Sequence, residues 1–190
     1  MYPKESLEII SKMMNDTRHN IMRNAVAPLL AWGWASFIVS IIVWGGLWLS
    51  RNDNWNFAWF LIPIIGMPLL RRLQPVDKGV STAISNSLVV IWKMLTVLIV
   101  VFSVTSFFVR FNVLSIILLI LAIGSFITGE LIRYHFLKYS SVPGFMLAAS
   151  MWWVTGLPQI LIFAISMVIM MIIPAYKIKQ ELQKENNERA

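Results

Sequence analysis

The sequence has no cysteine and few charged residues. The absence of cysteine excludes disulfide bonds, thiol catalysis and cysteine-ligated metal centres. Charged residues make up 13% of the 190 positions, about half of their share in a soluble domain, whereas hydrophobic residues make up 58%. Most of the chain therefore cannot face water. Its long apolar runs predict an all-α fold, a polytopic helix bundle in a membrane.

Sequence motifs of catalysis are missing as well. The chain has no HExxH, GxSxG or Walker motif and no pair of aspartates within an apolar run. Its two histidines, His19 and His135, are isolated from each other, which argues against a metal site. Basic residues lie in short segments between apolar runs and form no face of the kind that binds nucleic acid. The sequence thus predicts a protein that is not an enzyme, with no catalytic, cofactor or metal site and no nucleic-acid partner.

Apolar runs predict six transmembrane helices. They cover about residues 27–49, 55–70, 87–109, 113–132, 142–155 and 159–174, which together make up a predicted bundle of residues 27–174. A helix of about 20 residues crosses the roughly 30 Å hydrocarbon core of a bilayer. The last two runs are short and are separated by Gly156, Leu157 and Pro158. An alternative is that residues 142–174 re-enter the membrane from the cytoplasmic side, which leaves four full crossings.

The second predicted span, residues 55–70, contains Pro63, Gly66 and Pro68. Proline removes a backbone donor, and lipid offers the freed carbonyl no substitute partner. Irregular backbone is therefore expected in residues 55–72, and one interpretation is a discontinuous helix between Pro63 and Pro68. Such a break is typical of helices that line a cavity in transporters, although proline also occurs in ordinary membrane helices.

Residues 1–26 and 175–190 are the predicted polar ends of the chain. Four apolar residues and one threonine recur at helical spacing in the first segment, namely Leu7, Ile10, Met14, Thr17 and Ile21. This segment is a predicted amphipathic helix that ends before Pro28, since proline suits the first turn of a following helix. It either lies on the inner membrane surface or docks a cytoplasmic protein or a second copy of the chain. Residues 175–190 are a predicted helical cytoplasmic tail in which two pairs of opposite charges stand four residues apart.

Basic residues predict the orientation of the bundle. Thirteen of the sixteen Lys and Arg fall in the two ends and in residues 71–86 and 133–141, whereas Arg51 and Arg110 mark the opposite loops. Cytoplasmic loops of membrane proteins carry the excess of Lys and Arg. Both termini are therefore predicted to be cytoplasmic, and the bundle is predicted to lie in a cell inner membrane.

Small residues in the fourth predicted span share one helical face. Ser115, Ala122, Ser125 and Gly129 follow one another at offsets of seven, ten and fourteen from the first. Small side chains let membrane helices approach closely where the hydrophobic effect no longer drives association. These four residues are a predicted helix-packing seam.

Three charged residues near that region are candidate functional residues. Glu130 lies beside the seam, and ionisable groups within spans are costly and often functional. Arg133 follows one turn later, so the pair is either a structural ion pair or part of proton or cation coupling. Lys93 is the only lysine inside an apolar run, and it either snorkels to the inner surface or bonds Glu130 across the bundle.

Parts of the sequence resemble a family of small, uncharacterised bacterial multi-pass membrane proteins. The resemblance is carried by LEIISKMMNDTRHNIMRN followed by PLLAWGW, by WFLIPIIGMPL and by SFITGELI, and it covers most of the chain. Members begin with an amphipathic helix, followed by a first span with a Trp-Gly-aromatic motif. The resemblance implies a location in a bacterial membrane and supplies no catalytic or ligand residue.

Three functions remain open from these observations. The expected one is a non-enzymatic regulator, sensor or assembly subunit, because nearly all sequence available to a partner lies on the cytoplasmic face. Besides membrane lipid, its partner would be a cytoplasmic protein or a second copy of the chain. The alternative is a small-solute or ion transporter or channel that uses Glu130 and the proline-broken second span. The third function is a membrane enzyme that acts on lipids. It would need a nucleophile, a metal cluster or a phosphate-binding loop, and the sequence shows no recognisable motif for any of them.

Overall fold

The computed structural model describes residues 3–74 and 83–189, and the regular structure in these ranges is helical throughout. The elements are α1 (Pro3–Ser50), η1 (Asp53–Phe60), α2 (Leu61–Leu73), α3 (Ala83–Thr105), α4 (Val113–Leu131), α5 (His135–Ser150), α6 (Leu157–Met167), η2 (Val168–Ile172) and α7 (Ile173–Arg189). η1 is a 3₁₀-helix and η2 a π-helix. The prediction of an all-α fold is confirmed.

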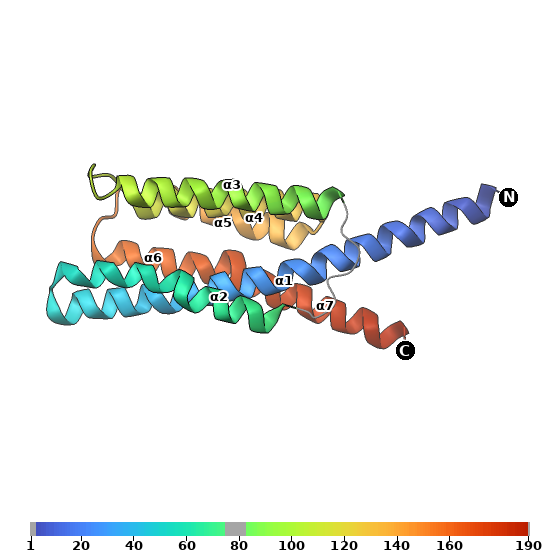
Figure 1. Cartoon of the computed structure of the whole chain (residues 1–190), viewed down its shortest axis with the longest axis horizontal. Helices are drawn as coiled ribbons and strands as arrows, with labels where there is room; N and C mark the ends of the chain where they lie inside the picture. The colour runs from blue at the N-terminus through green and yellow to red at the C-terminus, as the bar shows by residue number, and fades with distance from the viewer. Residues whose placement is uncertain (1–2, 75–82, 190) are drawn as a thin grey trace.

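The helices run side by side along one axis (Figure 1). α3, α4 and α5 form one group, and α1, α2 and α6 form the other. Within the groups α4 packs against α5 and α3, and α1 packs against α2 and α6. Both termini lie at one end of the bundle (Figure 1). The α1–η1 turn, the α3–α4 loop and the α5–α6 turn lie at the other end.

Four helical segments are long and apolar enough to cross a membrane. They are Ile21–Ser50, Asn86–Thr105, Val113–Leu131 and Leu157–Glu185. They overlap the first, third, fourth and sixth predicted spans. The other two predicted spans, residues 55–70 and 142–155, correspond to η1 with α2 and to α5. Residues 75–82 of the predicted inner loop and residues 1, 2 and 190 of the predicted ends lie outside the described residues, as do the side chains at positions 7, 10, 14 and 17.

α1 is one continuous helix, so the prediction that a first helix ends before Pro28 is wrong. Proline removes one backbone hydrogen bond from a helix interior. Here the neighbouring residues hold the helix together through packing, since Ala27, Leu29 and Ala31 are 2%, 3% and 0% exposed. Tertiary packing supplies most of the stability of a helix in a protein, and it outweighs the cost of the proline here.

The last predicted span and the tail also form one helix, because α6, η2 and α7 follow one another without a break. The π-helix η2 ends two residues before Pro174, the second residue of α7. In a regular α-helix the ring of Pro174 would clash with the carbonyl of Met170, four residues earlier. We attribute the wider π-turn to this clash. Met170 and Met171 are buried there, where η2 packs against α1 and α5.

The second predicted span is irregular in its first half only. α2 continues through Pro63, Gly66 and Pro68, so the helix is not discontinuous between the prolines. Pro63 lies in the first turn of α2, where its missing N–H has no intrahelical partner to lose. The irregular backbone is η1 instead, an eight-residue 3₁₀-helix that begins after Asn52. The side chain of Asn52 caps it by accepting a 3.0 Å hydrogen bond from the backbone N–H of Asn54.

The core lies between the two groups of helices. Its fully buried large side chains come from α1, α4, α5, the α5–α6 turn and the C-terminal helix, and include Val39, Leu118, Leu137, Met151, Met167, Met170 and Ile178. α1 also buries two small residues, Ala31 and Ala35, which are 0% exposed. A Cβ on Gly33 would lie 3.0 Å from Ile172, so α1 approaches η2 closely at this level. The core thus joins the first and last helices of the chain.

Candidate functional site

The predicted packing seam faces the interior of the bundle. Ser115, Ala122 and Ser125 are 2%, 0% and 0% exposed, and Gly129 is also buried. The two ends of the seam contact α5 directly. The Ser115 hydroxyl donates a 2.6 Å hydrogen bond to the Ala148 carbonyl. At the other end, a Cβ on Gly129 would lie 2.5 Å from the backbone nitrogen of Lys138. The hydroxyl of Ser125 is buried without a hydrogen-bond partner among the described residues.

A tight turn connects α4 to α5 and replaces most of the predicted loop of residues 133–141. Arg133 adopts a φ of 51°, a left-handed conformation that glycine usually supplies. The backbone N–H of Tyr134 donates to the Gly129 carbonyl at 2.8 Å, and that of Arg133 to the Glu130 carbonyl at 3.1 Å. These two bonds form a Schellman motif, which closes the C-terminus of α4. α5 consequently begins at His135 and folds back along α4.

Glu130 forms its ion pair with Lys138. Its carboxylate lies 2.6 Å from the Lys138 ammonium, and the two side chains are 60% and 30% exposed. The expected partner was Arg133. The tight turn accounts for the difference, because it places the first turn of α5 beside the last turn of α4. Ion pairs with this degree of exposure contribute little to stability. Among the described residues no ion pair joins Lys93 to Glu130.

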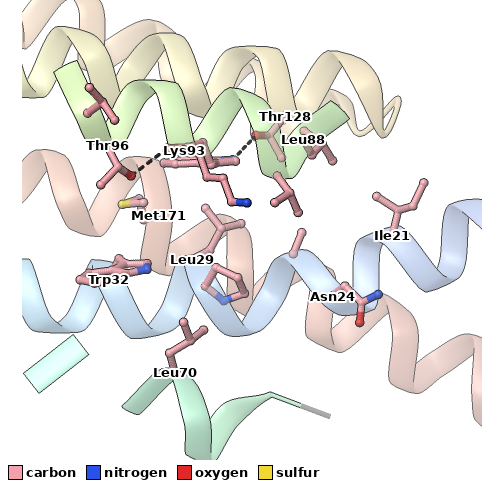
Figure 2. A pocket seen from close by; sticks show the side chains of 15 residues that line it. Ile21, Asn24, Leu29, Trp32, Leu70, Leu88, Lys93, Thr96, Thr128 and Met171 are labelled. Atoms are coloured by element: carbon pink, nitrogen blue, oxygen red, sulfur yellow. Dashed lines mark hydrogen bonds between the residues drawn. The ribbon is translucent and has the colours of Figure 1, made fainter. Parts of the chain in front are cut away.

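Lys93 lines a cleft between α1 and α3 with a volume of about 680 Å³. α3 packs against α4, and the cleft separates it from α1. Most of the lining is apolar, and includes Leu29, Trp32, Leu70, Leu88, Val97 and Met171. Figure 2 shows the Lys93 side chain extending from α3 into the space that faces α1. Lys93 is therefore a cation within a mainly apolar cleft.

The other polar groups of this cleft are engaged within the protein. The indole N–H of Trp92 donates a 3.1 Å hydrogen bond to the Thr128 hydroxyl, which fixes α3 on α4 (Figure 2). Thr128 in turn donates to the Gly124 carbonyl at 2.7 Å, and Thr96 donates to the Trp92 carbonyl at 2.8 Å. The hydroxyl protons of both threonines are thus used on backbone of their own helices.

Asn112 is a polar hub at the opposite end of the bundle, and sequence reasoning missed it. Its amide donates a 2.5 Å hydrogen bond to the Met151 carbonyl, and its side-chain oxygen accepts one of 3.2 Å from the backbone N–H of Ser115. The same oxygen accepts a hydrogen bond from the amide of Gln159. Asn112 thereby connects the α3–α4 loop to the α5–α6 turn. An asparagine directly before an apolar run is the signal of a helix N-cap.

A junction of three elements lies at the end of the bundle that holds both termini. The Tyr134 hydroxyl donates a 2.9 Å hydrogen bond to the Glu181 carboxylate, and the Lys177 ammonium lies 3.7 Å from the centre of the Phe136 ring. Ile178 and Leu182 of α7 are buried in the same cluster as Ile21 and Met22 of α1. These contacts fasten α7 to the α4–α5 turn and to α1.

Several predicted features of the polar ends are only partly described. The predicted pair of Glu185 with Arg189 involves a side chain outside the described set. Glu185 itself lies 3.8 Å from His19 of α1. His135 stacks on Tyr139, with ring centres 6.4 Å apart.

A comparison of the chain with family models, curated proteins and solved structures finds no match, so its resemblance to the small bacterial membrane proteins stays a prediction.

Proposed function

We propose that this chain is a multi-pass protein of a cell inner membrane that acts through contacts on its cytoplasmic face, without catalysis. In this proposal six helical segments cross the bilayer, and both termini are cytoplasmic. The protein is a regulator, a sensor or a subunit of a larger assembly. The observation that carries the proposal is the unbroken continuation of α1 and of the C-terminal helix beyond the apolar bundle.

The exposed surface supports the membrane location. The outer face of α3 carries a stripe of apolar side chains, in which Val90, Met94, Val101 and Val104 are between 52% and 66% exposed. Soluble proteins rarely expose a contiguous apolar stripe of this extent to water. At the end of the bundle opposite the termini, Trp152 and Trp153 are 61% and 82% exposed, as expected for residues at a membrane–water interface.

The Asn112 contacts support six crossings over re-entry of residues 142–174. They tie the α5–α6 turn to the α3–α4 loop, and Figure 1 places both at the end opposite the termini. A re-entrant segment would turn back before reaching that end. α5 has 16 residues and is about 24 Å long at about 1.5 Å per residue, so the bilayer must thin locally to match it.

The distribution of basic residues supports cytoplasmic termini. Arg71 and Arg72 end α2 on the side of the bundle that holds both termini, and the basic residues of α7 lie on that side as well. The opposite end carries Arg51 and Arg110. An excess of Lys and Arg marks the cytoplasmic side.

Two helices extend from this side as a stem, which we define as residues 3–20 of α1 and 177–189 of α7. α1 has 48 residues and is about 72 Å long, more than twice the roughly 30 Å of a hydrocarbon core. α7 is fastened at its base by the Tyr134–Glu181 hydrogen bond and by the Lys177–Phe136 contact. The stem is therefore an anchored helical projection, and a cytoplasmic protein or a second copy of the chain can dock on it.

A transporter or channel stays the alternative. The two features that suggested it, a proline-broken second span and an ionisable Glu130 within a span, now support it less. The second span is continuous at Pro63–Pro68, and Glu130 is an exposed residue paired with Lys138. The geometry thus favours the contact function. A test of Glu130 that separates the two functions is given in the Discussion.

The topology is tested by single-cysteine labelling, which has no background because the chain lacks cysteine. We expect Arg110→Cys and Thr155→Cys to react with a membrane-impermeant maleimide in intact cells. Gln74→Cys and Lys179→Cys should react only after permeabilisation. Reaction of Thr155→Cys only after permeabilisation, with Arg110→Cys unchanged, would indicate re-entry instead.

The contact function is tested by purification in mild detergent followed by native mass spectrometry. We expect a stoichiometric protein partner or a second copy of the chain. The double variant Lys179→Glu and Lys184→Glu on the stem should lose it, whereas Arg51→Glu with Arg110→Glu at the other end should keep it. A chain that is monomeric without a partner, and that conducts ions in reconstituted vesicles, would favour the alternative.

A further inference from the structure

We propose that the cleft between α1 and α3 binds one anionic phospholipid of the cytoplasmic leaflet, with the phosphate on Lys93 and an acyl chain along the apolar walls. The proposal rests on the membrane location proposed above. It adds a specific site and a lipid class to that location.

The size and lining of the cleft fit an acyl chain. Its volume of about 680 Å³ lies within the range of roughly 300–1,000 Å³ that is common for ligand sites. Leu29, Trp32 and Met171 line it on one side, and Leu88 and Val97 line it on α3. A water-soluble anion would gain nothing from such walls. A hydrocarbon chain replaces water or bulk lipid along their whole length.

Lys93 supplies the charge that an anionic lipid requires. Among the described lining residues it is the only cation, and its side chain extends into the cleft (Figure 2). The Thr96 and Thr128 hydroxyls donate to backbone carbonyls, so the ammonium is the donor best placed for an anion in the cleft. A lysine on its flexible stem binds phosphate as a point charge.

The position of the cleft favours a lipid of the cytoplasmic leaflet. Lys93 lies about 10 Å along α3 from Asn86, where the apolar span begins. Its ammonium can therefore reach the depth of the headgroups by snorkelling. Two further cations are neighbours of lining residues in the sequence, since exposed Arg23 precedes Asn24 and exposed Arg71 follows Leu70. Basic residues on this side attract anionic lipids. An apolar partner helix would fill the walls but would leave Lys93 without a counter-charge.

Lipid binding to the full-length chain in mild detergent tests the site. The delipidated protein is titrated with phosphatidylglycerol and with phosphatidylcholine of the same acyl chains, and bound lipid is counted by native mass spectrometry. We expect tighter binding of phosphatidylglycerol. Lys93→Gln should weaken its binding about fivefold, the effect of one cation near an anionic headgroup. The control Arg110→Gln, at an exposed arginine of the α3–α4 loop, should leave it unchanged.

A second pair of variants tests the walls independently of the charge. Val89 lines the cleft, whereas its neighbour Val90, which is similarly exposed, does not. Val89→Trp should fill the cleft and lower the binding of both lipids, and Val90→Trp should have no effect. Equal binding in the wild type and Lys93→Gln, or in Val89→Trp and Val90→Trp, would overturn the proposal.

Two further outcomes would also overturn it, for different reasons. If Val89→Trp abolished a dimer of the chain, the cleft would be an interface between two copies. If the chain stayed folded and soluble without detergent, the proposed membrane location itself would fail. A chain that needs detergent and shows no preference for phosphatidylglycerol would refute the lipid site alone.

Discussion

Gly129 of α4 and Lys138 of α5 meet backbone to backbone, so that a Cβ at position 129 would lie 2.5 Å from the Lys138 nitrogen and 2.9 Å from its Cα. This approach depends on the turn at Arg133, which directs α5 back along α4 within a few residues. The absence of a side chain at Gly129 therefore sets how closely these two helices pack.

Gly129→Ala should lower the free energy of unfolding by about 1–3 kcal/mol, because the atoms in its way are backbone and both helices must shift. The control is Gly45→Ala in α1, where an added Cβ meets nothing within 4 Å. That substitution should be neutral or stabilise the protein by up to about 1 kcal/mol through helix propensity. Thermal unfolding in detergent measures both. Equal melting temperatures for the two variants would show that the close approach is not important for stability.

Glu130→Gln should be silent both in stability and in ion flux. The carboxylate is paired with Lys138 but largely exposed, and exposed pairs contribute little. The measurements are the melting temperature and flux through reconstituted vesicles, each compared with the wild type and with Lys138→Gln. A collapse of flux in a variant that folds normally would assign Glu130 a role in transport.

Thr128→Val should loosen α3. Valine keeps the shape of threonine but cannot accept the hydrogen bond from the Trp92 indole, which then lacks that partner at the edge of the cleft. We expect a loss of about 0.5–1.5 kcal/mol in the free energy of unfolding. Thr96→Val is the matched control, since Thr96 bonds only the carbonyl of its own helix. If Thr128→Val and Thr96→Val had the same melting temperature, the Trp92–Thr128 hydrogen bond would not hold α3 in place.

Tyr134→Phe should release the base of α7 without unfolding the bundle. The substitution removes the hydroxyl that donates to Glu181, and a hydrogen bond of this kind contributes about 0.5–1.5 kcal/mol. Hydrogen exchange of the α7 amides should accelerate several-fold. Tyr139→Phe, at an exposed tyrosine on α5, should leave the exchange unchanged. Unaltered protection of α7 in Tyr134→Phe would mean that apolar packing of Ile178 and Leu182 suffices.

The sequence predicted features that depend on composition and on spacing along one helix. Apolar runs predicted an all-α fold, and the offsets from Ser115 to Gly129 identified residues that all turn out to be buried. Both signals are local, because lipid-like composition and helical periodicity can be read without knowing the neighbouring helices. The contact of Gly129 with Lys138 could not be read in this way, since it requires the geometry of the turn between them.

Proline positions misled the sequence interpretation for a related reason. Pro28, Pro63 and Pro68 each suggested a boundary or a break, and each lies within a helix. The cost of a proline is local, whereas the packing that offsets it comes from other helices. Asn112 was missed because its partners, Met151 and Gln159, lie far along the chain.

The π-helix η2 fixes the angular phase of everything that follows it. One π-turn contains one residue more than an α-turn, so α7 is rotated by roughly 100° relative to a straight continuation of α6. This rotation brings Ile178 and Leu182 onto the side of Ile21. Deleting one residue within Val168–Ile172 would turn those side chains outward, measurable as lost hydrogen-exchange protection in α7. The direction in which the C-terminal helix presents its surface is thus encoded by the number of residues in η2, inside the bundle and at a distance from the surface itself.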